Sequence, residues 1–418
     1  MFPSSSVSEE RMNFLIVFIF EIIYIKYIFS IYIMNYISDK ELKDRVERLR
    51  KLIKDKGLSG IIIYSDEYRS GYCTYFTGYK PINVIEESPQ TLILMENEDP
   101  ILVIGRLNYY SAKETVWINK ILQHHKFETE ITDLLKKFNK KGNKIGIAGE
   151  HLMPFYLRDI LTSAMPDINF QIETKILDNM RKIKSDKEIE LMERAASIND
   201  QVLTELKGII KVGMTEQQIV AHSDFLGRQL GADLGSATVV MSGKNTKFPA
   251  WRATDKKIEK GELLMIDFNP AIGNYCNDGG LTFLMPGASK FKLNALINSH
   301  KILKKTIKSI RSQTKATSVH DSFFEDLKPL NLDGNFSPYV SGTRGTGHGV
   351  GLDVVEFPDL NKTSDFILYP KMTLAVKLDL HDLEEQGLRV EQVVEITPEG
   401  ARPLNNLLVK SADDWAIL

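Results

Sequence analysis

Apolar residues follow two different patterns along the first half of the chain. Between Asp39 and Gly57, apolar residues recur every three or four positions, which predicts an amphipathic helix that ends at the glycine. Short apolar runs of strand length follow at residues 60–64, 91–95, 101–104 and 144–148. Because strands alternate with helical segments, we expect an α/β domain over residues 38–174.

The second half, residues 175–418, also alternates between helical and strand-like segments. Ser185 and Glu188 form a capping box before an apolar-periodic helix, and Thr215 and Gln218 repeat this signal before another helix. Two later segments alternate like strands; they read LLMIDFNPAIGNYCNDGGLTFL and GLRVEQVVEITPEG. A chain of 418 residues with this pattern should hold two or more domains.

The first 37 residues differ from the rest in composition. Residues 12–37 are apolar and aromatic and form a stretch long enough to span a bilayer. Glu21 and Lys26 interrupt this stretch, and each charge would be costly to place at the bilayer centre. No basic start and no small-residue cleavage site mark a signal peptide. Three interpretations stay open: a membrane anchor, a stretch that packs on another surface, or an extension before a true start at Met34. The abrupt change of composition favours the third.

Composition and charge narrow the function classes. The formal net charge is −2 and no long basic patch occurs, so nothing indicates nucleic-acid binding. Cys73 and Cys276 are the only cysteines, which excludes a disulfide framework and a thiolate zinc site and fits a reducing cytoplasm. We therefore expect a soluble cytoplasmic enzyme, with membrane contact only if residues 12–37 are a real anchor.

Asp267 and Asp278 lie eleven residues apart between two strand-like flanks, with a turn at residues 271–274. If the chain reverses at Ile272-Gly273, the two aspartates are cross-strand partners with Cβ atoms roughly 5 Å apart. Two buried carboxylates at that distance repel each other, and burying them unpaired would cost several kcal/mol. A metal ion between them is the usual solution. The alternative is a solvent-facing hairpin whose aspartates never meet.

Two further ligand candidates lie in the same half. His348 lies in the glycine-rich run SGTRGTGHGVGLDVVEFPD, where backbone can approach a site closely, and Glu391 lies in a strand-like segment. A single histidine in such a loop is more often a surface residue or one with its hydrogen bonds satisfied. Three carboxylates and an imidazole in one half instead indicate a metal site suited to manganese, cobalt, iron or zinc.

From about Glu41 to Leu404 the sequence resembles the pita-bread family of creatinase, prolidase (Xaa-Pro dipeptidase), aminopeptidase P and methionine aminopeptidase. The aspartate spacing and the string GTGHGVGLDVVEFP are the specific signals. The resemblance implies a creatinase-like α/β N-terminal domain, an α+β pita-bread catalytic domain and a homodimer. The ligands of the family's dinuclear metal centre match the following residues: Asp267, Asp278, His348 and Glu391.

The sequence departs from the family pattern at several positions. The family's fourth ligand, a glutamate, falls on Lys377 in MTLAVKLDLH. The two histidines that handle substrate and protons in the family's peptidases fall on Ala250 and Val355. Arg389, just before the final ligand, is kept, whereas the aspartate that often follows that ligand is Gln392.

Lys377 changes the charge of the expected centre. Three carboxylates, at Asp267, Asp278 and Glu391, and one ammonium leave a charge of minus two, which one divalent ion neutralises. A lysine among carboxylates also avoids the cost of an unpaired buried charge. We therefore expect at most one divalent metal per chain, or none, with Lys377 near the position of the second metal. The alternative is that Lys377 points to solvent.

Two functions follow from the resemblance. The first is a metal-dependent hydrolase of small Xaa-Pro peptides, in which the metal activates a water molecule. The second is a creatinase-like hydrolase or lyase that acts on a small polar metabolite, with Lys377 as charge partner, general acid or anion anchor. In either case we expect Lys377, His348 and Arg389 to take part in catalysis. A binding protein with a decayed site is a third alternative, which the retained ligands oppose.

Overall fold

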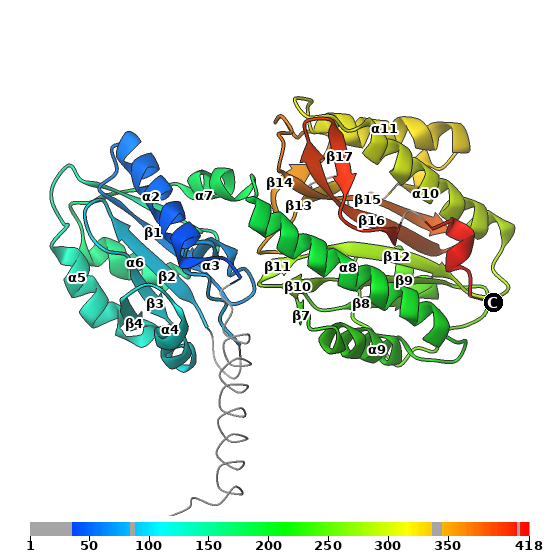
Figure 1. Ribbon diagram of the computed structural model, residues 1–418, viewed down its shortest axis with the longest axis horizontal. Helices are drawn as coiled ribbons and strands as arrows, with labels where there is room; N and C mark the ends of the chain where they lie inside the picture. The colour runs from blue at the N-terminus through cyan, green and yellow to red at the C-terminus, as the bar shows by residue number, and fades with distance from the viewer. Residues whose placement is uncertain (1–35, 84–87, 337–344, 408–409, 418) are drawn as a thin grey trace, which may run out of the picture.

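The computed structural model describes residues 36–83, 88–336, 345–407 and 410–417. These residues form two lobes joined by helix α7 (Thr174–Arg181) (Figure 1). The apolar stretch before residue 36 lies outside the described residues, so its three interpretations stay open. Within the described ranges, no helix combines the length and the apolar character that a membrane crossing requires. The domain limits at residues 37 and 174 stay predictions.

The first lobe contains a six-stranded sheet in the order β4-β3-β2-β1-β5-β6. Its strands are β1 (Gly60–Ser65), β2 (Gln90–Met95), β3 (Ile101–Ile104), β4 (Lys120–Gln123), β5 (Lys144–Ala148) and β6 (Asn169–Ile172). Its helices are α2 (Asp39–Asp55), α3 (Gly71–Thr77), α4 (Tyr109–Thr115), α5 (Thr132–Lys136) and α6 (Phe155–Ala164). The predicted helix and all four predicted strands are confirmed.

Both faces of this sheet are buried. In β1, Ile61 and Ile63 pack into one hydrophobic core, whereas Ile62 and Tyr64 pack into another on the opposite face. Alternate residues of a strand point to opposite faces, so a strand covered on both sides must be apolar throughout. This explains why β1 reads as an unbroken apolar run rather than as an alternating one.

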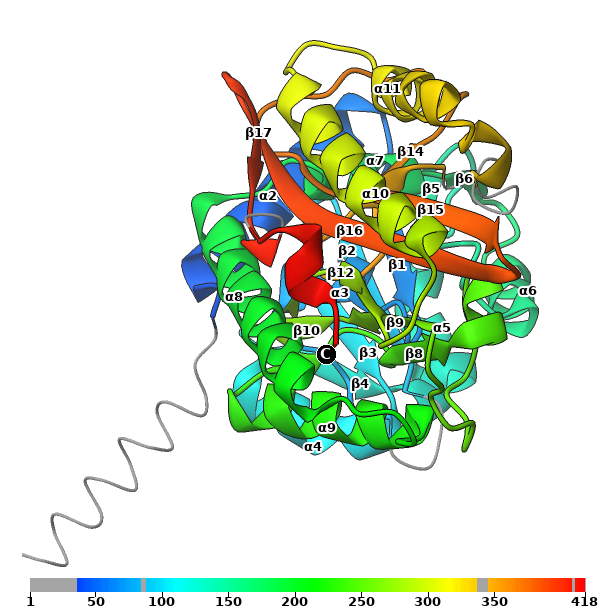
Figure 2. The same cartoon turned by 90° about the vertical axis from the view of Figure 1, so that its right-hand side faces the viewer.

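The second lobe packs two main sheets between pairs of helices, and Figure 2 shows α8 and α9 on one side and α10 and α11 on the other. One sheet has the order β12-β9-β8, another β14-β13-β15-β16-β17, and a small third one β11-β10-β7. The helices are α8 (Asp186–Ile209), α9 (Glu216–Gln229), α10 (Lys290–Ser309) and α11 (Thr317–Leu327). The first strands are β7 (Asp233–Leu234), β8 (Val239–Ser242), β9 (Leu263–Phe268), β10 (Pro270–Ile272), β11 (Tyr275–Cys276) and β12 (Gly279–Leu284). The others are β13 (Gly347–Gly349), β14 (Glu356–Leu360), β15 (Thr373–Leu383), β16 (Gln386–Thr397) and β17 (Gly400–Pro403).

Both predicted capping boxes are present, at the starts of α8 and α9. In each, the N-cap hydroxyl accepts from the backbone of the third helical residue, whose side chain bonds back to the cap. The expected architecture, an α/β domain followed by an α+β pita-bread domain, is confirmed.

The register predicted for the aspartate hairpin is wrong by two residues. The chain reverses at Gly273 and Asn274, which both have positive φ angles as a two-residue hairpin turn requires, and not at Ile272-Gly273. Asp267 therefore lies opposite Gly280, and Asp278 is its diagonal neighbour instead of its direct partner. The error came from placing the turn one residue early, since each such step shifts the register by two.

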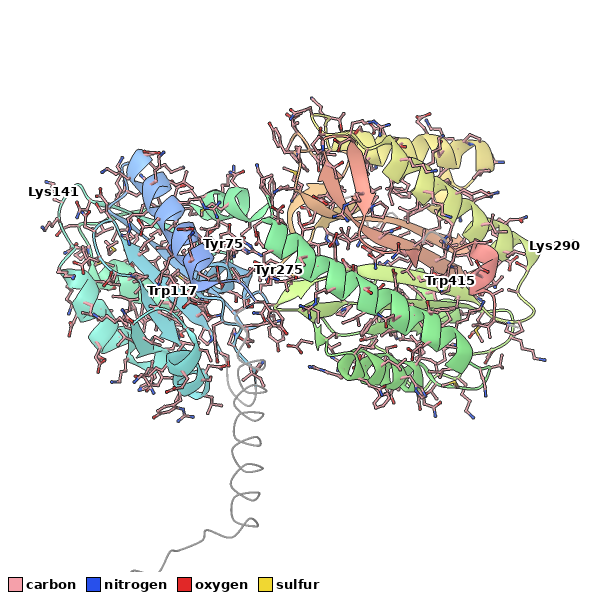
Figure 3. The ribbon with its side chains drawn as sticks, viewed as in Figure 1. Tyr75, Trp117, Lys141, Tyr275, Lys290 and Trp415 are labelled. Carbon is pink, nitrogen blue, oxygen red and sulfur yellow. The ribbon has the colours of Figure 1, made fainter. Side chains whose placement is uncertain are left out.

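The two lobes meet at a buried hydrogen-bonded junction. Arg45 of α2 donates to the Tyr275 hydroxyl at 3.2 Å and lies 3.2 Å from the carboxylate of Glu188. Tyr275 in turn donates to Glu188 at 2.6 Å. The Arg45 guanidinium also lies over the ring of Tyr75, and Figure 3 shows Tyr75 and Tyr275 where the lobes adjoin. These contacts fix the first lobe against the second lobe.

A second junction joins α7 to β14. Arg181 forms ion pairs with Asp353, at 2.7 Å, and with Glu356, and Lys184 lies 3.1 Å from the other oxygen of Glu356. Burial opposes ionisation of Glu356, but Arg181 and Lys184 outweigh burial and hold the pKa of this carboxyl at about 2. The cluster therefore holds the connecting helix against the edge strand of the large sheet.

We expect Glu356→Gln to lower the free energy of unfolding at pH 7 by about 3 kcal/mol, because two buried cations lose a carboxylate partner. A carboxyl whose pKa is lowered by folding stabilises above its unfolded pKa, and this stabilisation disappears as the folded carboxyl is protonated. The difference should therefore shrink as the pH falls from the ordinary carboxyl range toward 2. Urea unfolding at pH 7, 5 and 3 measures it, with the exposed Glu325→Gln as control. A difference that stays constant with pH would contradict the expectation.

Candidate metal centre

Three strands of the large sheet place ionisable side chains on one face. His348 on β13 lies opposite Ala375 on β15, and Lys377, two residues further along β15, lies opposite Glu391 on β16. Directly opposite residues, and residues two apart on a strand, share a face of the sheet. His348, Lys377 and Glu391 therefore point the same way, toward the sheet that contains β12.

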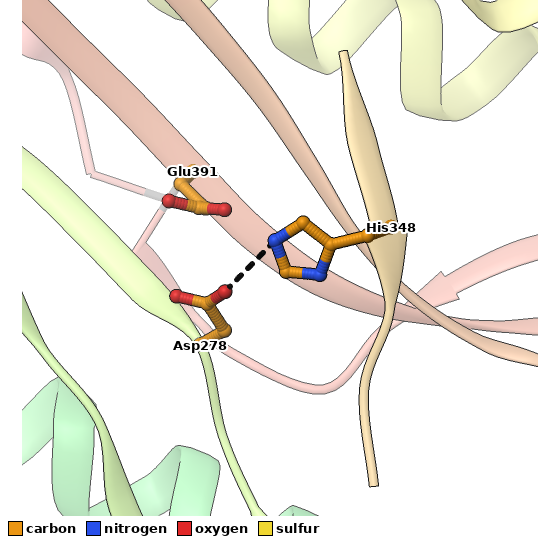
Figure 4. Close-up of side chains that lie close together, drawn as sticks. All are labelled: Asp278, His348 and Glu391. Atoms are coloured by element: carbon orange, nitrogen blue, oxygen red, sulfur yellow. Dashed lines mark ion pairs between the residues drawn. The ribbon is translucent and has the colours of Figure 1, made fainter. Parts of the chain in front are cut away.

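Asp278, His348 and Glu391 form a buried cluster (Figure 4). His348 Nε2 lies 3.2 Å from Asp278 Oδ2, and one donor atom from each of the three residues lies within 4.8 Å of the others. All three residues are at most 4% exposed. Among the described residues, no other group of histidine, cysteine and acidic side chains has this spacing. The structure thus brings together three of the four predicted ligands.

Asp267, the fourth predicted ligand, is held by Arg389. Arg389 Nη1 donates to Asp267 Oδ2 at 2.7 Å, and its Nε donates to Asp379 Oδ1, also at 2.7 Å. Arg389 Nη2 donates to the carbonyl oxygen of Pro249 at 3.1 Å. The other carboxylate oxygen of Asp267, Oδ1, is buried without a hydrogen-bond partner. One oxygen of Asp267 is thus occupied, while the other can accept a ligand.

Lys377 points inward. Its side chain is 12% exposed, and Nζ lies 3.6 Å from Glu391 Oε1. Burial lowers the pKa of this lysine, but the nearby carboxylates of Glu391, Asp379 and Asp278 together outweigh burial and raise the pKa above its ordinary value. The ammonium is therefore charged at neutral pH, and the alternative in which Lys377 points to solvent does not hold for this structure.

The positive charge beside the cluster does not offset the burial of its carboxyl groups. Burial, followed by repulsion from Glu391 and Asp267, raises the pKa of Asp278 well above its usual range. Burial also raises the pKa of Glu391 to about 7, although Lys377 opposes this shift. Carboxyl groups that resist ionisation despite a nearby lysine and arginine indicate a site in which a further cation would be stabilised.

Three carboxylate oxygen atoms without a hydrogen bond fit a divalent metal. Glu391 Oε1 and Oε2 and Asp267 Oδ1 are all buried without a hydrogen bond, although Lys377 Nζ and Arg389 Nε lie 3.6 and 3.9 Å from the two Glu391 oxygens. A buried carboxylate oxygen without a partner is costly, and such atoms are usually satisfied by a donor or an ion. Carboxylate oxygens together with the imidazole of His348 form a donor set that suits manganese, cobalt, iron or zinc. The residues present therefore fit the expected metal.

Sequence reasoning missed two residues of the site. Asp379 pairs with Arg389, its cross-strand partner, and Gly280 lies opposite Asp267. A Cβ atom at Gly280 would lie 3.0 Å from Arg389 Cδ and 3.5 Å from Glu391 Oε2, so the glycine leaves room for both side chains. The signal for Asp379 is in the sequence: a Lys-x-Asp and an Arg-x-Glu occupy matching positions on the two strands of one hairpin.

Ala250 and Val355 stand where the peptidases of the resembled family have histidines, and neither residue carries a proton-transfer group. Ala250 follows Pro249, whose carbonyl oxygen binds Arg389. Val355 lines a cavity of about 260 Å³. Alkyl side chains at both positions cannot donate or accept protons, so any proton transfer must use other groups.

Comparison with known proteins supports what the geometry indicates. Residues 190–398 match a model described as metallopeptidase family M24, and residues 45–183 match the creatinase/prolidase N-terminal domain. The chain belongs to metallopeptidase family M24. We therefore assign this M24 protein as a hydrolase.

Relatives of this M24 protein cover almost the same length. It is 23% identical to the Xaa-Pro dipeptidase of Pyrococcus furiosus, over 87% of this chain and 98% of that protein. An uncharacterised peptidase of Bacillus subtilis is 27% identical with the same coverage. The crystal structure of an X-Pro aminopeptidase from Thermotoga maritima has a TM-score of 0.77 at 22% identity, covering 87% of this chain and 97% of that one. These likenesses establish the fold.

Proposed function

We propose that this protein hydrolyses Xaa-Pro peptides with one divalent metal ion per chain. The inward-facing Lys377, 3.6 Å from Glu391, is the observation that supports a reduced centre. Its ammonium lies beside the candidate metal-ligand atoms of the cluster, where it would repel a second cation. The names of the relatives, which include Xaa-Pro dipeptidases, support the substrate class.

The charges in the structure agree with one metal ion. Beyond Asp267, Asp278, Glu391 and Lys377, the site contains one further pair of opposite charges, Arg389 with Asp379. Because this pair is neutral, the remaining charge is still minus two when the carboxyl groups of Asp267, Asp278 and Glu391 are all ionised. One divalent ion cancels this charge, whereas two would leave an excess of positive charge in a buried site, which is costly.

Each side chain has a defined role in this proposal. Asp278, His348 and Glu391 would hold the ion, and Asp267 Oδ1, on the carboxylate that Arg389 binds, would be a further ligand atom. The chemistry that a bound divalent ion would supply is acidification of a water molecule and polarisation of the carbonyl of the reacting bond. Lys377 presents a charged donor beside this position, and it stabilises negative charge that develops on the substrate oxygen.

A second candidate function is hydrolysis or elimination on a small polar metabolite. It is favoured by Ala250 and Val355, because peptidases of the resembled family have histidines there, and by Lys377 as an anchor for an anionic group. We also propose the cytoplasmic location and the homodimer expected from the resemblance. Light scattering of the purified protein tests the homodimer.

The test is an activity screen with protein stripped of metal and then loaded with manganese, cobalt, iron or zinc. Xaa-Pro peptides, matched peptides without proline, and small amide and amidino metabolites are the substrates. We expect metal-dependent cleavage of the Xaa-Pro peptides only, removed by a chelator. Turnover of a metabolite without peptide cleavage would replace the first candidate with the second, and no turnover of either would contradict both.

A further inference from the structure

We infer that a cavity between the two lobes binds a small neutral molecule that has an aliphatic body and a carbonyl or hydroxyl oxygen. The cavity has a volume of about 250 Å³, and Asp267, Asp278, His348 and Glu391 do not line it. It is therefore a site apart from the metal centre, and the inference does not depend on the proposed peptidase function. The position of the cavity, its lining and one buried nitrogen of Arg45 support it.

Both lobes contribute to the wall of this cavity. Arg45 of α2 and Thr74 of α3 line it from the first lobe. Ile272 of β10 and Tyr275 of β11 line it from the second lobe. Figure 3 shows Tyr275 where the two lobes adjoin. A ligand in the cavity therefore touches both lobes at once and adds to the contacts that hold them together.

Arg45 has a buried hydrogen-bond donor that the protein does not satisfy. The residue is 1% exposed, and its Nε has no hydrogen-bond partner among the described residues. Its Nη1 donates to the carbonyl oxygen of Tyr75 at 3.0 Å and to the Tyr275 hydroxyl at 3.2 Å, and its Nη2 donates to Glu41 at 2.5 Å. A buried N–H without a partner is costly. Because Arg45 lines the cavity, an oxygen atom of a ligand there can accept this hydrogen bond and remove the cost.

The charges around Arg45 favour a neutral ligand. Glu41 and Glu188 lie 2.5 and 3.2 Å from its guanidinium, so two carboxylates face one cation and the group has a net charge of minus one. This charge would repel a ligand carboxylate. An alkylammonium has donors but no acceptor, so it cannot satisfy Nε. A carbonyl or hydroxyl oxygen accepts the hydrogen bond and adds no charge.

The rest of the lining suits a small aliphatic group. Four buried apolar residues form much of the wall, namely Ile37, Leu42, Ile272 and Leu352. A cavity of about 150 Å³ holds one benzene molecule, so about 250 Å³ leaves room for a somewhat larger one. Asp233, which also lines the cavity, is exposed and marks the side from which a ligand can enter. An aliphatic amide or alcohol fits this size and lining.

The test is a ligand-observed NMR titration of the full chain with three probes that share one carbon skeleton: isovaleramide, isovalerate and isopentylamine. We expect the amide to bind about tenfold or more tightly than either charged probe, because each of those leaves a charge or a donor unmatched. Asp233→Trp places an indole at the mouth of the cavity and should weaken amide binding by about tenfold or more, because the indole takes the space of the ligand. Gln229→Trp is the matched control, since Gln229 is exposed and does not line the cavity; it should bind the amide normally.

Hydrogen–deuterium exchange locates the bound amide in the unmodified protein, so the test does not depend on how well a variant folds. With saturating isovaleramide, backbone amides near Thr74 and near Ile272 should exchange more slowly, because a ligand that bridges the lobes opposes local opening on both sides. Slower exchange in one lobe only, or near His348 instead, would overturn the inference. Equal binding of the three probes, undiminished amide binding by Asp233→Trp, or no binding of any probe would also overturn it.

Discussion

Lys377→Glu is expected to raise the metal content from one divalent ion per chain to two. The substitution removes a cation that lies 3.6 Å from Glu391 and adds a carboxylate at the position of the missing family ligand. The site becomes two charges more negative, which matches one additional divalent ion. Metal analysis by mass spectrometry after exhaustive desalting measures the change. Native activity should fall, because the ammonium that stabilises charge on the substrate is lost.

Lys377→Met provides the matched control for this result. It removes the same cation and retains an unbranched side chain, but it adds no ligand. We expect its metal content to stay at one ion per chain. A second tightly bound ion in Lys377→Met, or a single ion in Lys377→Glu, would show that the lysine does not determine the metal number.

Asp278→Asn is expected to abolish both metal binding and turnover. The amide keeps the shape of the side chain but removes the charge of a residue that lies within reach of His348 and Glu391. Loss of a residue that merely supports a ligand weakens metal binding by about 10–100-fold, so loss of a ligand should cost at least the upper end of that range. Metal titration followed by thermal unfolding measures this, because an ion that binds only the folded protein raises the melting temperature.

A second readout of Asp278→Asn does not depend on activity. Burial and repulsion from Glu391 and Asp267 raise the pKa of Asp278 well above its usual range. Without metal, the neutral amide removes that repulsion, so the variant should be at least as stable as the metal-free native protein. Asp321→Asn, an exposed position on α11, serves as control and should bind metal normally. A metal-dependent rise in melting temperature that persists in Asp278→Asn would contradict the ligand assignment.

The fold could be predicted from the sequence where local rules determine structure. The apolar period of α2, the unbroken apolar strands of the first lobe and the capping boxes of α8 and α9 depend on neighbours in sequence, and all are confirmed. The register of the aspartate hairpin was missed because one residue in the position of the turn decides it. Gly273 and Asn274, both with positive φ, are the residues that allow the tight turn.

The grouping of Asp278, His348 and Glu391 was predictable from the sequence, and the surroundings of these residues were less so. The charge argument indicated an inward Lys377, and the structure places its ammonium beside Glu391. The Arg389–Asp379 pair was missed because it requires the register of β15 against β16, which the residue pattern alone does not give. A cavity between α7 and β14 is lined by residues about 180 positions apart in the chain, such as Asp178 and Asp359. Contacts of that separation follow from the packing of the lobes and not from any local pattern.

The metal content of the unmodified protein tests the central claim most directly. The protein is purified without added metal, reloaded with manganese, cobalt, iron or zinc, and desalted to remove loosely bound ions. It should then contain one divalent ion per chain. The four carboxylates and two cations of the site leave a charge of minus two, which one ion neutralises. Two tightly bound ions per chain, with efficient cleavage of Xaa-Pro peptides, would contradict the proposal that Lys377 replaces the second metal.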